Sequence, residues 1–194
     1  MSMIWRINMK EELNKFFKSA FWLCIVLFIL RCFFARESLI NDFSLYAMFG
    51  YISEAIGVTV ILTTIYERFL WRYNPLNKTP VLKRKYKGKL RSTYDGTTRD
   101  VKVEIKQTLL TIKIVLSTEE SKSNSVTASI TNIYCEKQLT YCYINTPNAF
   151  VRNRSNIHYG TVMMCVDDIN NLYGQYYTDR KTTGDIELTP DDVK

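Results

Sequence analysis

The sequence is poor in the residues on which most catalytic and metal sites depend. It has a single histidine, His158, and five cysteines that form no closely spaced pair. One imidazole excludes any site that needs two, and five dispersed cysteines argue against a disulfide framework or a four-thiolate zinc site. The sequence has no glycine-rich phosphate loop, and 194 residues are too few for a large multidomain enzyme. We therefore predict a protein that is not an enzyme and carries no cofactor or metal.

The residues that are present divide sharply along the chain. Nine of the ten phenylalanines lie at or before Phe69, and nine of the thirteen tyrosines lie at or after Tyr86. Overall, 46% of the residues are hydrophobic and the formal net charge is +7. The uneven distribution of aromatic residues indicates two regions with different surroundings, lipid for the first and water for the second.

Two apolar segments near the start are each long enough to cross a membrane. They cover about residues 16–34 and 45–66, and a helix of the first length reaches roughly 28 Å, the thickness of a bilayer core. Arg31 lies near one end of the first segment, where its long side chain can extend to the headgroups. A pair of buried helices in a soluble bundle is the alternative, but the remaining sequence is typical of strands. We predict a transmembrane helical hairpin over residues 1–72.

Basic residues flank the two segments unevenly. Several Lys and Arg residues precede the first segment and follow the second, whereas the connection at 36–44 contains only Arg36. Excess Lys and Arg mark the cytoplasmic side of a membrane, so we expect both termini in the cytoplasm.

The second apolar segment has an unusual face. Gly50, Ser53, Glu54 and Gly57 are spaced three and four residues apart, so they share one side of a helix. Small residues permit close helix approach, and a carboxyl group within a span is costly unless it is paired or faces water. One interpretation is packing within the hairpin, with Glu54 protonated or paired with Arg31. The other is self-association between chains, with this face lining a polar path.

After a predicted linker at 73–80, which contains two prolines, the pattern changes to period two. Val101, Val103 and Ile105 alternate with charged residues, and further alternating runs continue to residue 190. We predict an all-β domain over 81–190 and favour an eight-stranded up-and-down β-barrel over a sandwich, because a small barrel leaves no edges and can hold one small ligand. The predicted strands cover 86–93, 101–106, 110–117, 126–135, 139–145, 159–166, 172–178 and 185–188, with a turn at 119–124.

The positive charge is concentrated at the start of this domain. Residues 78–113 contain eleven Lys and Arg and three acidic residues, whereas residues 114–194 have a net charge of −3. Attraction to anionic lipid explains the cluster at 83–89 well and the lysines further along the strands less well. The charge is local, so it does not indicate a long nucleic acid as the partner.

Tyrosine and arginine in the later strands complete a candidate site. Tyrosine rings can stack on bases and arginine can pair with phosphates, although tyrosine is also common in strands for structural reasons. We expect residues that face the barrel interior to be the best candidates, and His158 to lie on the surface or at the barrel rim. The candidate ligand-binding residues are Tyr86, Arg91, Lys102, Lys106, Lys113, Tyr141, Tyr143, Tyr176 and Arg180.

With this organisation, the chain resembles the Cap15 family (CD-NTase-associated protein 15), two-transmembrane, strand-rich effectors of bacterial anti-phage (CBASS) immunity. The resemblance lies in the architecture and in three segments. These are Glu67-Arg-Phe-Leu-Trp-Arg-Tyr-Asn-Pro-Leu76, Tyr86-Lys-Gly-Lys-Leu90 and Leu172-Tyr-Gly-Gln-Tyr-Tyr-Thr-Asp-Arg-Lys-Thr-Thr-Gly-Asp-Ile-Glu-Leu188.

The resemblance implies a function. A nucleotide cyclase (the CD-NTase) makes a cyclic dinucleotide, with 3′,3′ linkage favoured, and the barrel binds it. The helices then oligomerise, disrupt the cell inner membrane and kill the infected cell. From their spacing, and not from the resemblance, we expect Gly50, Ser53, Glu54 and Gly57 to form the contact between chains. Two alternatives from other classes remain: a membrane-anchored barrel that carries a lipid or apolar ligand, and a constitutive pore-forming toxin.

Overall fold

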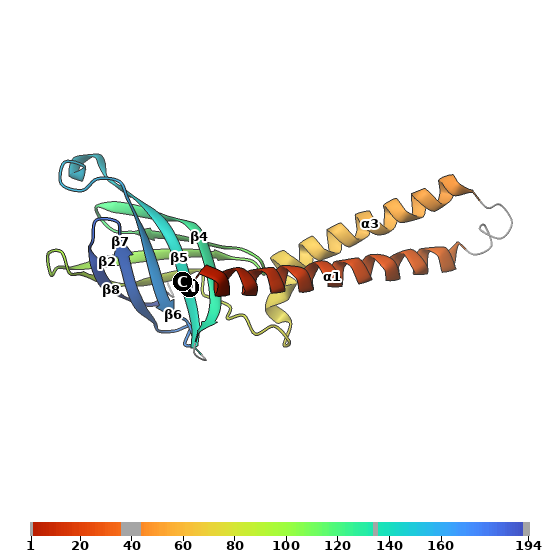
Figure 1. Cartoon of the computed structure of the whole chain (residues 1–194), viewed down its shortest axis with the longest axis horizontal. Coiled ribbons are helices and arrows are strands. Elements are labelled where there is room, and N and C mark those ends of the chain that lie inside the picture. The colour runs from red at the N-terminus through yellow and green to blue at the C-terminus, as the bar shows by residue number, and fades with distance from the viewer. Residues whose placement is uncertain (1, 36–43, 134–135, 192–194) are drawn as a thin grey trace. The chain divides into compact units, whose positions relative to one another are not determined.

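The computed structural model describes residues 2–35, 44–133 and 136–191. The chain divides into two compact units, Met1–Asn74 and Pro75–Lys194. Figure 1 shows the first unit as a pair of helices and the second as a barrel of strands. Each unit is described separately below.

The first unit is a helical hairpin followed by a short turn of 3₁₀ helix. Helix α1 covers Ser2–Phe34, α3 covers Leu45–Arg68, and η1 covers Leu70–Tyr73. The segments Leu13–Phe34 and Leu45–Arg68 are long and apolar enough to cross a membrane. Many of their large apolar side chains are exposed in the isolated chain, which is the arrangement that lipid-facing helices require.

The two helices pack through one side of α3, where Ala55 and Thr59 are buried. The small-residue face lies elsewhere: Ser53 is exposed, and a side-chain carbon added at Gly50 or Gly57 would meet no atom within 4 Å. Among the described residues, Gly50, Ser53 and Gly57 are therefore left uncovered by α1, and only Glu54 of this face contacts it.

Glu54 has a partner within the hairpin. The Nε of Arg31 donates a hydrogen bond to Oε2 of Glu54 over 2.7 Å, and the guanidinium of Arg31 lies 4.5 Å from the ring centre of Tyr51. The two charges offset each other, as an ionisable residue in an apolar segment requires. Of the two sequence interpretations, pairing of Glu54 with Arg31 is present in this structure.

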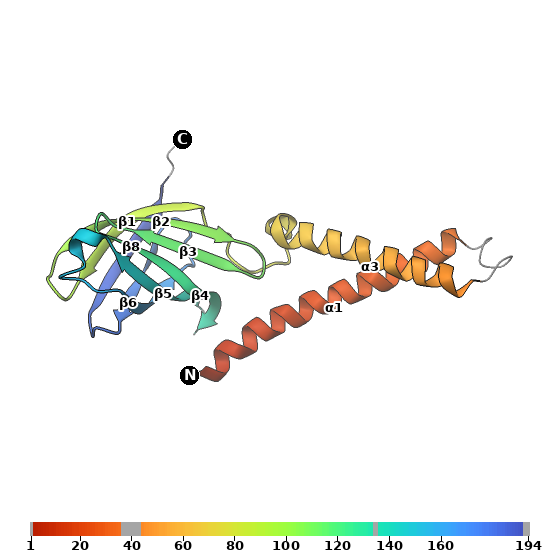
Figure 2. The same cartoon turned by 90° about the horizontal axis from the view of Figure 1, so that it is seen from above.

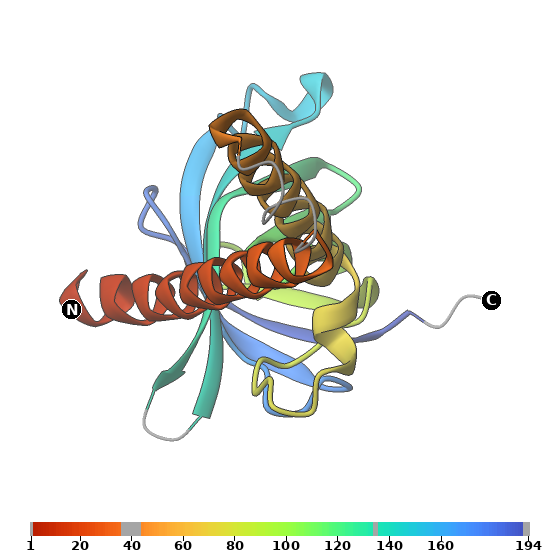
Figure 3. The same cartoon turned by 90° about the vertical axis from the view of Figure 1, so that its right-hand side faces the viewer.

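The second unit is a closed, eight-stranded antiparallel barrel in which each strand pairs with its sequence neighbours and β8 returns to pair with β1. This confirms the up-and-down barrel and excludes the sandwich. Figure 3 shows the strands arranged around a common centre. The strands are β1 (Lys85–Ser92), β2 (Thr98–Gln107), β3 (Ile112–Ser117), β4 (Ser121–Ile133), β5 (Glu136–Pro147), β6 (His158–Cys165), β7 (Leu172–Thr178) and β8 (Thr183–Pro190).

The up-and-down order gives the barrel two ends. We call the end at which the chain enters β1 the linker end; it also carries the connections 108–111 and 166–171. We call the other the loop end, and a 3₁₀ turn, η2 (Ala149–Val151), lies in one of its connections. The connections at the loop end are 93–97, 118–120, 148–157 and 179–182. Figure 1 shows 148–157 as the cyan loop that projects beyond the strands.

One strand boundary differs from the prediction in an informative way. Strand β4 begins at Ser121, within the segment predicted as a turn at 119–124. Ser123 is buried there and pairs with Asn145 of β5. The segment was missed because its inward side chains are polar, so it lacks the apolar alternation by which strands are recognised. Part of the predicted strand 126–135, at 134–135, lies outside the described residues.

Candidate functional site

The barrel interior has an apolar half at the linker end. Its side chains form one buried cluster that includes Leu82, Tyr86, Val103, Ile105, Ile114, Leu139, Met164, Leu172 and Leu188. The hydroxyl of Tyr86 accepts a hydrogen bond from the backbone N–H of Lys83 and donates one to the carbonyl of Ile169, both over 3.0 Å. The side-chain oxygen of Gln107 accepts from the backbone N–H of Leu82 over 2.9 Å. These contacts fasten the entering chain across the linker end, so Tyr86 is a structural residue of the core.

The interior changes from apolar to polar toward the loop end. Nδ2 of Asn145 donates hydrogen bonds to the hydroxyls of Ser121 over 3.0 Å and Ser123 over 2.8 Å. Ser123 and Asn145 are both buried, so this amide holds two strands together inside the barrel. Because buried polar groups are costly unless they are satisfied, a polar network in a barrel interior indicates a site rather than simple packing.

Two tyrosines lie among these polar groups, each 7% exposed. Tyr143 of β5 is opposite Gly160 of β6, and Tyr176 of β7 is opposite Gly184 of β8. A side-chain carbon added at either glycine would overlap the ring of the tyrosine opposite. Each ring therefore lies closely against the barrel wall, over a position that any other residue would fill. Aromatic rings of this kind are the groups on which a base can stack.

Burial controls the protonation of these hydroxyls. Loss of solvent raises the pKa of Tyr143 far above its usual range and also raises the pKa of Tyr176. Both phenols are therefore neutral at physiological pH, and each has an O–H that can donate to an anionic or carbonyl oxygen.

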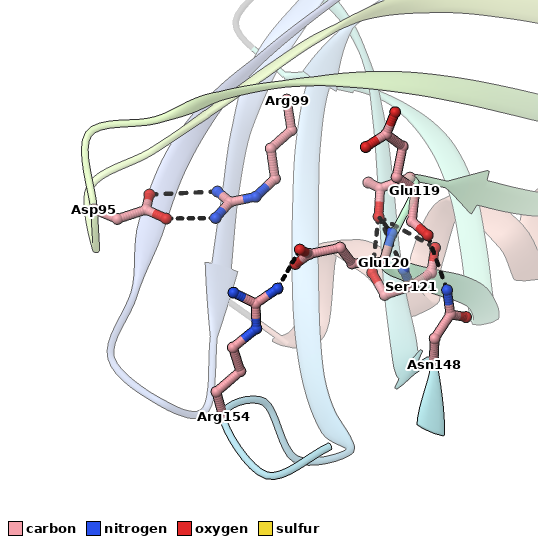
Figure 4. Close-up of polar contacts among 8 residues, drawn as sticks. Asp95, Arg99, Glu119, Glu120, Ser121, Asn148 and Arg154 are labelled. Carbon is pink, nitrogen blue, oxygen red and sulfur yellow. Dashed lines mark hydrogen bonds and ion pairs between the residues drawn. The ribbon is translucent and has the colours of Figure 1, made fainter. Parts of the chain in front are cut away.

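Arginines complete the loop end, and each is held by a carboxylate (Figure 4). Arg99 of β2 forms two hydrogen bonds with Asp95, and Arg154 pairs with Glu120. Figure 4 shows the Arg154–Glu120 pair beside Arg99 in the same part of the barrel. The hydrogen bonds from Arg99 lower the pKa of Asp95 well below its usual range. The two guanidinium groups thus already bind anionic oxygens in this structure.

A third arginine lies at the rim. Nη2 of Arg180 is 2.7 Å from Nδ1 of His158 and donates a hydrogen bond to the hydroxyl of Ser155 over 3.2 Å. Burial lowers the pKa of His158, and the charge of Arg180 lowers it further. His158 is the first residue of β6, at the loop end.

The structure separates the predicted site residues into two groups. Tyr141, Tyr143 and Tyr176 face the interior near the polar half, with the rings of Tyr141 and Tyr143 centred 6.1 Å apart, and Arg180 is at the loop end. Tyr86 also faces inward, but at the linker end. Four predicted site residues of β1, β2 and β3 were expected to face the interior, and this expectation was wrong. They alternate along their strands with buried residues and therefore point outward. These outward residues are Arg91, Lys102, Lys106 and Lys113.

Sequence reasoning missed several polar residues of the loop end. Arg99 shares the inward parity of Val101, Val103 and Ile105, which could have identified it before the structure was known. Arg154 lies in the connection 148–157, outside every predicted strand, so the period-two pattern could not identify it. Asn145 likewise shares the inward parity of Leu139, Tyr141 and Tyr143 in β5. Ser123 has no such apolar neighbours, and its inward direction follows from the register of β4 against β5.

The comparisons with known proteins agree with this geometry. Residues 77–190 match the family model described as "Cap15, cyclic dinucleotide receptor domain". The chain belongs to the Cap15 family. It is 32% identical over 186 residues to "CD-NTase-associated protein 15" of Staphylococcus schleiferi, covering 93% of this chain and 98% of that protein.

The Cap15 match covers the whole barrel, from the linker to the end of β8. The family description is that of a receptor rather than of a catalyst. Among the described residues, no group of three or more His, Cys, Asp and Glu side chains is placed to hold a metal ion.

Proposed function

We propose that this Cap15 protein is a cyclic-dinucleotide-activated effector of anti-phage immunity, and that the loop end of its barrel binds the ligand. The observation that carries the proposal is the meeting of buried tyrosine rings and arginines at one end of a barrel matched by a cyclic dinucleotide receptor family. We keep Tyr141, Tyr143, Tyr176 and Arg180 from the sequence prediction and add Arg99 and Arg154.

The chemistry of the ligand fits these groups. A cyclic dinucleotide has two phosphodiesters and two bases, so it needs two cationic clamps and two stacking faces. Arg99 and Arg154 serve as the clamps, with the phosphates taking the places that Asp95 and Glu120 now occupy. Tyr143 and Tyr176 offer the faces, and the Asn145 amide and the serine hydroxyls are positioned to read polar base edges. A 3′,3′-linked ligand is our preferred candidate.

The helical unit supplies the output in this proposal. We infer that both helices cross the cell inner membrane with the termini in the cytoplasm. Lys and Arg are concentrated before the first apolar segment and after the second, and an excess of these residues marks the cytoplasmic side. No described residue covers Gly50, Ser53 or Gly57, and these small residues are suited to close packing between chains. Glu54 belongs to the same oligomerisation face. If Glu54 released Arg31 of its own chain, its carboxylate would lie between neighbouring chains.

Ligand binding is coupled to assembly through differential affinity. The ligand promotes oligomerisation only if it binds the assembled state more tightly than the single chain. A CD-NTase supplies the ligand, assembly disrupts the membrane, and the infected cell dies. The carrier alternative predicts a barrel lined with apolar groups throughout, whereas this barrel is polar at the loop end.

Titration calorimetry of the full chain against a panel of cyclic dinucleotides tests the receptor proposal. We expect one ligand to bind with a Kd of about 1 μM or tighter, and Tyr176→Leu to weaken it. Absence of binding to every ligand would overturn the proposal. Dye release from vesicles then tests the output: release should require the ligand and should be lost in Gly57→Leu. Release without ligand would favour the constitutive toxin.

A further inference from the structure

The outer surface of β1, β2 and β3 brings lysines together in a way that the sequence does not reveal. In the strand register Lys87 is opposite Lys102, and Lys106 is opposite Lys113. All four are exposed, and partners in an antiparallel pair project from the same face. Like charges directly opposite each other destabilise a sheet. This arrangement is therefore unfavourable unless an anionic partner offsets it.

Toward the loop end, the same face is electrically balanced. Lys89 is opposite Asp100 on one side and Glu187 on the other, and Arg91 is opposite Asp185. The acidic residues of β2 and β8 thus neutralise the basic residues of β1 in this part of the barrel. The charges on this part of the outer surface therefore balance.

Toward the linker end, the balance is only partial: Lys85 is opposite Glu104 of β2. Lys87 pairs with Asp191 over 3.3 Å. In contrast, Lys102, Lys106 and Lys113 form no ion pair with any carboxylate in the described parts of the chain. The excess positive charge therefore lies near the end of the barrel where the chain arrives from the helical unit.

Three more basic residues lie where the chain enters the barrel, and all are exposed. Figure 2 shows β1, β2 and β3 along one side of the barrel. We define the basic flank as Lys83, Arg84, Lys85, Lys87, Lys102, Lys106 and Lys113. The segment between Tyr73 and Lys85 ties this flank to helices long and apolar enough to span a bilayer. A short tether raises the effective concentration of the flank at whatever surface anchors those helices.

We propose that the basic flank is a docking surface for anionic phospholipid headgroups, so that the barrel rests on the membrane by this side. The inference rests on the membrane anchoring in the proposed function. A headgroup layer is an extended surface of negative charge, which matches lysines spread over three strands better than a small ligand does. Each lysine near an anionic leaflet strengthens binding about fivefold, and salt weakens the attraction.

Lysine footprinting of the full chain tests this surface. The chain is placed in nanodiscs of phosphatidylcholine alone or mixed with phosphatidylglycerol, without nucleotide. It is then treated with an amine-reactive reagent, and each lysine is quantified by mass spectrometry. We expect the reactivity of Lys102, Lys106 and Lys113 to fall about fivefold in the anionic discs and to recover in high salt. Lys122 and Lys181, which are exposed elsewhere on the barrel, are internal controls and should not change.

A pair of matched variants separates the flank from general charge. Lys106→Gln/Lys113→Gln should remove most of the protection of Lys102, whereas Lys122→Gln/Lys181→Gln, with the same change in net charge, should leave it intact. Equal loss in both variants would contradict a specific surface.

The remaining outcomes are also decisive. Equal lysine reactivity in both lipids overturns the inference, and protection already complete in neutral discs would indicate a protein contact instead. A chain that fails to co-elute with either disc contradicts the anchoring in the proposed function as well. A chain that co-elutes but shows no lipid-dependent protection contradicts this inference alone.

Discussion

The two faces of β2 carry positive charge in different ways. On its inward-facing side, at the loop end, Arg99 is held in a fixed geometry by Asp95. Outside, Lys102 and Lys106 project without an ion-pair partner among the described residues. A guanidinium recognises two oxygens of one anion in a defined direction, whereas a lysine acts as a mobile point charge. This difference is the reason why we propose a small ligand for the inward-facing arginine and an extended anionic surface for the outward-facing lysines.

Removing one cation from each face of β2 should have very different effects on ligand binding. We expect Arg99→Gln to weaken cyclic dinucleotide binding about 100-fold, because it removes a charge-assisted, two-point contact. Lys102→Gln, three residues away on the same strand, should change the affinity less than about twofold. Calorimetry on both variants measures the difference, and a similar loss in both would place the ligand outside the barrel.

A second test compares the apolar and polar halves of the interior. Leu172→Ala, at a fully buried core position, should lower the free energy of unfolding by about 3 kcal/mol and leave ligand affinity unchanged while the barrel is folded. Tyr143→Phe should lower affinity about tenfold with a smaller effect on stability, because it removes one donor. Denaturant unfolding and calorimetry provide the two readouts. If Tyr143→Phe changed stability alone, Tyr143 would be only a core residue.

Removing a competing carboxylate should produce the opposite effect. Glu120→Gln frees Arg154 from its partner, so we expect cyclic dinucleotide affinity to rise about threefold. Glu119→Gln is a matched control, since it changes the same charge in the same turn and Glu119 has only its backbone carbonyl bonded to Asn148 in Figure 4. Binding isotherms at a fixed salt concentration distinguish the two. Equal gains would indicate a long-range charge effect.

The smallest expected effect is on the pH dependence of stability. Arg99 lowers the folded-state pKa of Asp95, so the charged carboxylate stabilises the fold above its unfolded pKa of about 4, and this contribution is lost as the pH falls. Wild type should therefore melt at a higher temperature than Asp95→Asn at pH 6, and the gap should close in acid. In an Arg99→Gln background the gap should be small at both pH values. A gap that widens in acid would contradict the assigned pairing.

Much of the barrel could be predicted from the sequence, because the apolar side chains of its linker half alternate with charged ones. The run through Val101, Val103 and Ile105 both identifies a strand and fixes which side chains point inward. The same parity places Lys102 and Lys106 outside, so their expected place in an interior site conflicted with the pattern that predicted the barrel.

The polar half could not be predicted in the same way. Ser121 and Ser123 look like turn residues, and their place in a strand follows from pairing with β5, more than twenty residues later. The Asn145 amide that joins them is another long-range contact. Residues that bind ligand break the apolar alternation, so the part of a barrel most relevant to function gives the weakest strand pattern.

The most direct test of the central claim is an experimental structure of the full chain with a bound cyclic dinucleotide. We expect phosphate oxygens within hydrogen-bond distance of Arg99 and Arg154, with the Asp95 and Glu120 carboxylates displaced and a base against the ring of Tyr143 or Tyr176. A ligand bound on the outer face, at Lys102, Lys106 and Lys113, with both arginine–carboxylate pairs intact, would contradict it.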